Sequence, residues 1–114
     1  MRRTALHLFD INGHFGESAL DREFPTHRDL LAHMDRLGIR RALAWHAAAR
    51  QFHATHGNRL LLETLAASPA AARRLVPAFT IAPVMKDEPG ALDALGRVVA
   101  SGRVRAVRIF PAAL

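Results

Sequence analysis

Four short apolar runs, separated by segments with a helical period, most constrain what this chain can fold into. The runs are ALHLF (5–9), RRALAWH (40–46), LVPAFTIAP (75–83) and VRAVRIFP (104–111). Their centres lie near Leu8, Leu43, Phe79 and Val107, so successive centres are 35, 36 and 28 residues apart. Strands that alternate with helices at this spacing predict parallel strands joined by right-handed helical crossovers.

The segments between the runs carry helix signals. In residues 26–38, Thr26 is a good N-cap, Asp29 occupies the capping-box position and Gly38 follows the last apolar residue of the period. Further helices are predicted over residues 57–68 and 88–102, with a short helical turn at 70–74. The predicted order is therefore β-α-β-α-β-α-β, which is typical of α/β proteins with a parallel sheet.

Two architectures accept this order, an open doubly wound sheet and part of a (β/α)8 barrel. A whole barrel takes about 250 residues, and the 114 residues of this sequence are about half of that. No helix follows the fourth run, although a parallel sheet needs both faces covered. We therefore expect residues 1–114 to be one domain, the amino-terminal half of a (β/α)8 barrel with its first four strands and three helices. It would belong to a longer fold or find its missing half in a partner, with self-association through the uncovered strands.

Composition limits the kinds of partner that we expect the chain to bind and indicates its cellular compartment. The chain has no cysteine and no apolar run near the ~20 residues that span a bilayer. Met1, Arg2 and Arg3 precede no long apolar segment, so we expect a cytoplasmic protein without a signal peptide or a membrane partner. The formal net charge is +6, but the arginines are scattered and no aromatic residues interleave with them, so we expect no nucleic-acid partner.

Parallel α/β folds gather functional side chains at the carboxyl ends of their strands. After the first run come Asp10, Asn12 and His14, spaced by two, and residues at this spacing on an extended chain point to one side. They are candidates for a metal site or a substrate pocket, and the alternative is that His14 is a loop histidine. The same rule selects His46 as a pocket-lining candidate, together with residues 82–86 and 110–112. Trp45 is interpreted as a core or layer-packing aromatic.

Two other patterns give weaker signals. The turn Gly13-His14-Phe15-Gly16 lacks both the G-x-G-x-x-G pattern and the Gly-Lys-Ser/Thr of phosphate-binding loops. His53 and His56 form an H-x-x-H pair, but no glutamate lies between them and no third ligand is evident. We therefore interpret the pair as part of a loop or a helix start.

Four segments, in the right order and covering nearly the whole chain, resemble the amidohydrolase superfamily, and the amidohydrolase-related branch looks closest. The segment FDINGHFG resembles the opening metal motif D-x-H-x-H-x-G, and LLAHMDRLGIRRALAWH resembles the first helix and second strand, LL-x-x-MD-x-x-GI-x-x-A. RLVPAFTIAP resembles the third strand after R-x-x-P, and GRVRAVRIFP resembles the fourth, G-x-x-G-V-R-(L/I)-x-P. The resemblance implies a metal-dependent (β/α)8 barrel that hydrolyses C–N or C–O bonds, or decarboxylates a small carboxylate.

The resemblance also implies roles for individual residues. The two histidines of the opening motif bind a divalent metal, usually zinc; His14 matches the second of them, and Asn12 stands in place of the first. Asp10 matches the acid of the motif, which we expect to be a supporting residue, not a ligand. The remaining ligands follow later strands that this sequence does not contain. Zinc prefers imidazole, thiolate and carboxylate to an amide, so the replacement puts the metal in question.

Two alternatives to the metal-dependent hydrolase stay open at this point. One is a metal-free barrel that binds a small molecule or has a structural role. The other is an open α/β nucleotide-binding domain.

Overall fold

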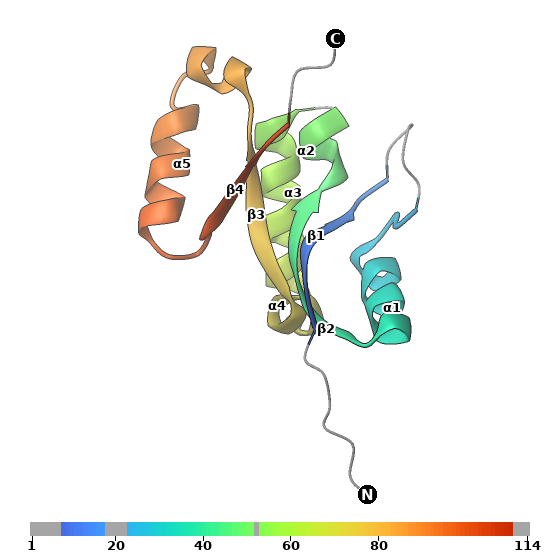
Figure 1. Ribbon diagram of the computed structural model, residues 1–114. Coiled ribbons are helices and arrows are strands. Elements are labelled where there is room, and N and C mark those ends of the chain that lie inside the picture. Colours follow the sequence, from blue (N-terminus) through green and yellow to red (C-terminus); the bar gives the residue numbers. More distant parts are fainter. Residues whose placement is uncertain (1–7, 18–22, 52, 111–114) are drawn as a thin grey trace, which may run out of the picture.

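The chain folds into a curled sheet with helices packed on its convex face (Figure 1). A computed structural model describes residues 8–17, 23–51 and 53–110. Within them the elements are β1 Leu8–Phe15, α1 His27–Leu37, β2 Ile39–His46, α2 Ala47–Gln51, α3 Ala54–Ala67, α4 Pro69–Arg74, β3 Leu75–Ile81, the 3₁₀-helix η1 Pro83–Asp87, α5 Ala91–Ala100 and β4 Ala106–Ile109.

The strands form one four-stranded sheet in the order β1-β2-β3-β4, and every neighbouring pair is parallel. The expected α/β class and the parallel pairing are therefore confirmed. Because the strand order follows the chain without a reversal, the described sheet has no switch point of the kind at which doubly wound folds bind nucleotides.

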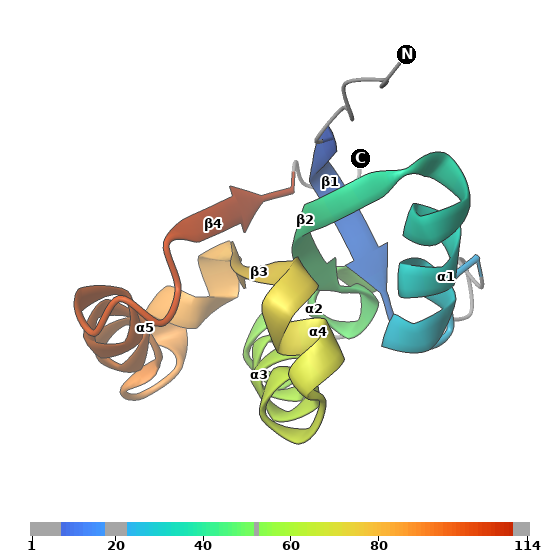
Figure 2. The same cartoon turned by 90° about the horizontal axis from the view of Figure 1, so that it is seen from below.

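The sheet curls into half of a barrel (Figure 2). In a flat sheet, three strand spacings would separate β1 from β4 by about 14 Å. Here Arg108 Nη1 of β4 donates to Asn12 Oδ1 of β1 at 2.6 Å, so side chains of the first and fourth strands meet across the concave face. Helices α1, α3 and α4 pack on the convex face, against β1, β2 and β3.

Helix α1 forms where its sequence predicts, because both of its ends carry local capping signals. Thr26 accepts from the Asp29 amide while the Asp29 carboxylate accepts from the Thr26 amide, which completes the capping box. Gly38 ends the helix in the left-handed conformation, at φ 71°. The apolar face buries Leu30 and Met34 in the main core.

Strand β1 runs further than its sequence predicts. The apolar run ends at Phe9, yet the strand continues through the glycine-containing segment to Phe15. Gly13, His14 and Phe15 pair with Ala44, Trp45 and His46 of β2, and this pairing outweighs the local turn signal. Residues 5–7 of the predicted strand lie outside the described residues.

Beyond the end of β2, a side chain continues the ladder of β3. The pairing of β2 with β3 stops at Ala44 and Pro77, but β3 runs on to Ile81. Asn58 of α3 lies beside this extension, where its Oδ1 accepts from the Thr80 amide at 2.8 Å and its Nδ2 donates to the Thr80 carbonyl at 3.0 Å. Both residues are buried, so Asn58 satisfies backbone groups that no strand reaches.

Helix α5 packs less closely than the other long helices. None of its residues is buried, although Leu95 and Val98 touch the core cluster. An apolar groove of about 400 Å³ separates it from α3, with Phe79 and Met85 among the residues that line it. Among the described helices, none is long and apolar enough to span a membrane.

Candidate functional site

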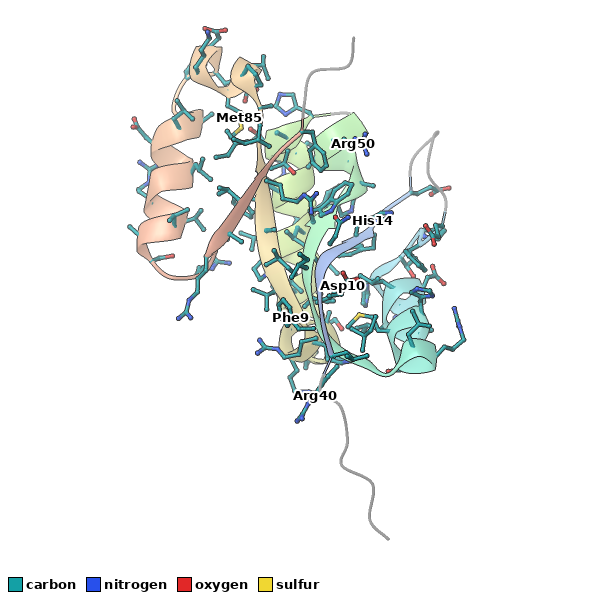
Figure 3. All side chains as sticks on the ribbon, viewed as in Figure 1. Phe9, Asp10, His14, Arg40, Arg50 and Met85 are labelled. Carbon is teal, nitrogen blue, oxygen red and sulfur yellow. The ribbon has the colours of Figure 1, made fainter. Side chains whose placement is uncertain are left out.

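Aromatic and cationic side chains gather on the concave face, at the end of the sheet toward which the strands point. We define the concave cluster as Asn12, His14, Trp45, Arg50, Arg108 and Phe110. His14 stacks on Trp45, with ring centroids 5.0 Å apart and planes 23° from parallel. Phe110 meets Trp45 edge-on at 4.8 Å. Figure 3 shows His14 and Arg50 at this end of the sheet.

Two guanidinium groups lie over the rings of the concave cluster. Arg108 lies 5.6 Å from the Trp45 ring centroid and 5.2 Å from that of Phe110. Arg50, on α2, lies 5.0 Å from the Phe110 centroid. Cations over aromatic faces are attracted by the ring quadrupole, so the rings hold both positive charges in place.

Asn12 connects Trp45 to Arg108. Its Oδ1 accepts from Trp45 Nε1 at 3.3 Å and from Arg108 Nη1 at 2.6 Å. Its backbone amide donates to Asp10 Oδ1 at 2.8 Å, an Asx-type contact that shapes the strand locally. Asp10 therefore acts on the cluster through the backbone of Asn12.

An irregularity in β1 changes which way Asp10 points relative to His14. Asp10 pairs with Ala42 and His14 pairs with Trp45, so four steps along β1 match three along β2. A bulge of this kind breaks the alternation of side chains between the two faces. The rule that residues spaced by two share a side therefore fails across the bulge, and the structure brings together Asn12 and His14 but not Asp10.

His46 lies on the opposite face of the sheet from His14. It pairs with Phe15, the residue after His14, and the Phe15 and His46 rings meet edge-on at 5.2 Å. There it lines a hollow of about 540 Å³ between α1 and α3, separate from the concave cluster. Its Nδ1 accepts from the Ala48 amide at 3.1 Å. Burial, and secondarily the nearby His56, lowers the pKa of His46 below its ordinary value of 6.5.

Gly16 follows His14 and Phe15 where β1 ends. Its φ of 122° lies in the region that favours glycine, and a Cβ there would fall 2.6 Å from His46 Cε1. The chain can therefore turn close to the His46 ring only because position 16 has no side chain.

The surroundings of Asn12 fit an anion better than a metal cation. Asn12 Oδ1 already accepts from an indole and from a guanidinium, and a cation beside it would be repelled by Arg108. Within residues 8–17, 23–51 and 53–110, no group of three or more His, Cys, Asp or Glu side chains could hold a metal ion. His14 as a metal ligand stays a prediction.

The two histidines of the H-x-x-H pair have different partners. His53 immediately precedes α3, as the sequence favoured, and its Nε2 lies 2.7 Å from Glu88 Oε1. The other oxygen of Glu88 accepts from Thr55 at 3.1 Å. His56, inside α3, lies 3.1 Å from Arg59 Nη2. His53 and Thr55 thus tie the segment after η1 to the start of α3.

Sequence reasoning found part of the concave cluster. Asn12, His14 and Phe110 follow from the strand-end rule, whereas residues 111 and 112 lie outside the described residues. Trp45 is buried, as its interpretation as a core aromatic requires, but it also supplies the central ring of the cluster. Arg50 and Arg108 were missed; the position of Arg108, two residues before Phe110 at the end of the fourth apolar run, was the available signal.

Comparison of the chain with protein-family models, with curated proteins and with solved structures finds no match. The class that the fold and the cluster define is therefore an α/β protein with a parallel, curled half-barrel sheet and a cationic aromatic cluster at the carboxyl ends of its strands.

Proposed function

We propose that the chain is half of a (β/α)8 barrel of the amidohydrolase-related kind and that its concave cluster binds the carboxylate of a small molecule. The observation that carries the proposal is the pair of guanidinium groups, Arg50 and Arg108, held over rings at the carboxyl ends of the strands. This is the end at which barrels of this kind build their active sites.

The chemistry of the cluster suits a planar anion with an apolar body. Arginine has five donors in a rigid fork, and Asn12 takes one N–H of Arg108, which leaves others for a carboxylate. Because Asn12 and the two rings fix the guanidinium of Arg108, little side-chain freedom is lost when it binds. Phe110 and Trp45 would contact the apolar part of the ligand.

Fluorescence titration tests this proposal, because Trp45 is the only tryptophan of the chain. We expect benzoate to change the Trp45 emission in a saturable way, and neutral benzamide, which has nearly the same shape, to have a much weaker effect. Arg108→Gln should lower the affinity for benzoate at least about tenfold, because a charge-assisted pair is lost. Arg97→Gln, at an exposed position of α5, is the matched control. Equal responses to benzoate and benzamide would refute carboxylate binding.

The metal-dependent hydrolase or decarboxylase implied by the resemblance is the second candidate function. It is favoured by His14, which lies beside Asn12 on the concave face at the end of β1. Elemental analysis of the purified protein separates the two candidates. Zinc bound by the natural chain and lost in His14→Ala supports the metal-dependent function. Zinc gained only in Asn12→His, together with benzoate binding by the natural chain, supports the metal-free binder.

A further inference from the structure

Both outer strands of the sheet present open edges with exposed apolar side chains. In the part of the chain that the structure describes, β1 pairs only with β2, and β4 pairs only with β3. Phe9 and Ile11 on β1 are 49% and 73% exposed, and Val107 and Ile109 on β4 are 46% and 71% exposed. An open edge of this kind is a ready template for another strand.

The direction of the strands indicates which strand each edge can accept. All four strands run parallel, and an added strand that keeps this pattern is parallel as well. The β1 edge of a second copy satisfies this at β4, and the β4 edge of the same copy satisfies it at β1. A single two-fold axis, the axis of the barrel, produces both contacts at once. The pairing therefore gives a closed dimer and not an open chain of copies.

The curvature of the sheet is compatible with closure at eight strands. Side chains of β1 and β4 already meet across the concave face, through Asn12 and Arg108. Eight strands form a barrel whose interior is just filled by side chains. Two copies of this half-barrel supply eight strands, and each copy covers the concave face of the other.

We propose that two copies of this chain close into one eight-stranded parallel barrel, with β4 of each copy paired to β1 of the other. The proposal depends on the sheet and its edges and does not require that the concave cluster bind a ligand. The occupant of each edge is thus the opposite edge of an identical chain.

Disulfide cross-linking tests the pairing directly, because the natural chain has no cysteine. Single-cysteine variants at the exposed β1 positions (Phe9→Cys, Ile11→Cys) are mixed with variants at the exposed β4 positions (Val107→Cys, Ile109→Cys) under mild oxidation. Neighbouring strands bring Cα atoms within disulfide reach. We expect at least one β1–β4 mixture to give a covalent dimer, and each variant alone to give no more than the control. Leu92→Cys, on α5 and 48% exposed, is that control.

Light scattering after gel filtration supplies the second measurement. The dimer has twice the chain mass of 12.5 kDa. Ile109→Lys should weaken dimerisation about tenfold, because the neighbouring strand of the second copy would partly cover the Ile109 side chain and each dimer contains the contact twice. Leu92→Lys, the matched exposed control, should leave the dimer intact, and circular dichroism should show that both variants keep their helices.

Four results would each overturn the proposal. Two concern size: a monomer at every concentration measured, and particles larger than a dimer. The others are cross-linking of a β4 variant with itself as efficient as with a β1 variant, and equal dissociation constants for Ile109→Lys and Leu92→Lys.

Discussion

Removal of the side-chain amide of Asn58 should destabilise the fold more than the small size of this group suggests. The side chain is 5% exposed and makes two hydrogen bonds, of 2.8 and 3.0 Å, to the amide and the carbonyl of Thr80. In Asn58→Ala both backbone groups stay buried and lose their partners, at a cost of roughly 1.5 kcal/mol each. We therefore expect the free energy of unfolding to fall by about 3 kcal/mol. For a chain of this length the melting temperature should drop by ~12 °C.

Urea unfolding at a fixed protein concentration, followed by the emission of Trp45, measures this loss. Thr64→Ala on the same helix is the matched control, because the Thr64 hydroxyl donates only to the Leu60 carbonyl within α3. A loss in Asn58→Ala no larger than that in the control would refute the idea that Asn58 completes the ladder of β3.

The nearly isosteric variant Asn58→Asp tests the direction of the two hydrogen bonds. An ionised carboxylate still accepts from the Thr80 amide, but it also places an oxygen against the Thr80 carbonyl and buries a charge. Protonation restores a donor, so the difference from the natural chain should shrink as the pH falls through the raised pKa of the new carboxyl group. A difference that does not change with pH would contradict the assigned hydrogen bonds.

Three further perturbations have defined expectations. Thr26→Ala removes the side-chain half of the capping box and should cost about 1 kcal/mol in urea unfolding; Thr64→Ala, whose hydroxyl bonds only within α3, serves as its control. Arg74→Met should cost about 1.5 kcal/mol through loss of the donors to the Ile39 and Arg40 carbonyls, and exposed Arg73→Met should cost much less. Because the folded-state pKa of His46 lies below 6.5, the unfolded chain takes up the proton first as the pH falls. Stability should then be fully present well above pH 6.5 and decline as the pH falls from 6.5 toward the lowered pKa, and His46→Gln should flatten this decline. Equal slopes for the two proteins would refute the shift.

The elements predicted best from the sequence are those whose ends are determined locally. Helix α1 begins and ends within one residue of its predicted bounds, because Thr26, Asp29 and Gly38 act within a single turn. The extension of β1 past Gly13 was not predictable in this way, because it depends on pairing with β2. Helix α2, Ala47–Gln51, was missed because five residues are too few to show a helical period.

The residues of the candidate site were likewise predictable only where local sequence determines their position. The strand-end rule located Asn12 and His14, since it requires only the order of strands along the chain. It could not show that Arg108 reaches Asn12, because that contact depends on the curl of the sheet. Nor could it place His46 on the convex face, because a face assignment requires the register of β1 against β2.

The hydrogen bond between Asn12 and Arg108 has a consequence for the order of assembly. The two residues are 96 positions apart, and closing a loop of that length costs about 4 kcal/mol of chain entropy. The contact can form only when β1, β2, β3 and β4 are all in place. During synthesis the concave cluster must therefore stay unassembled until β4 has emerged from the ribosome, and a chain cut anywhere before Arg108 lacks it altogether.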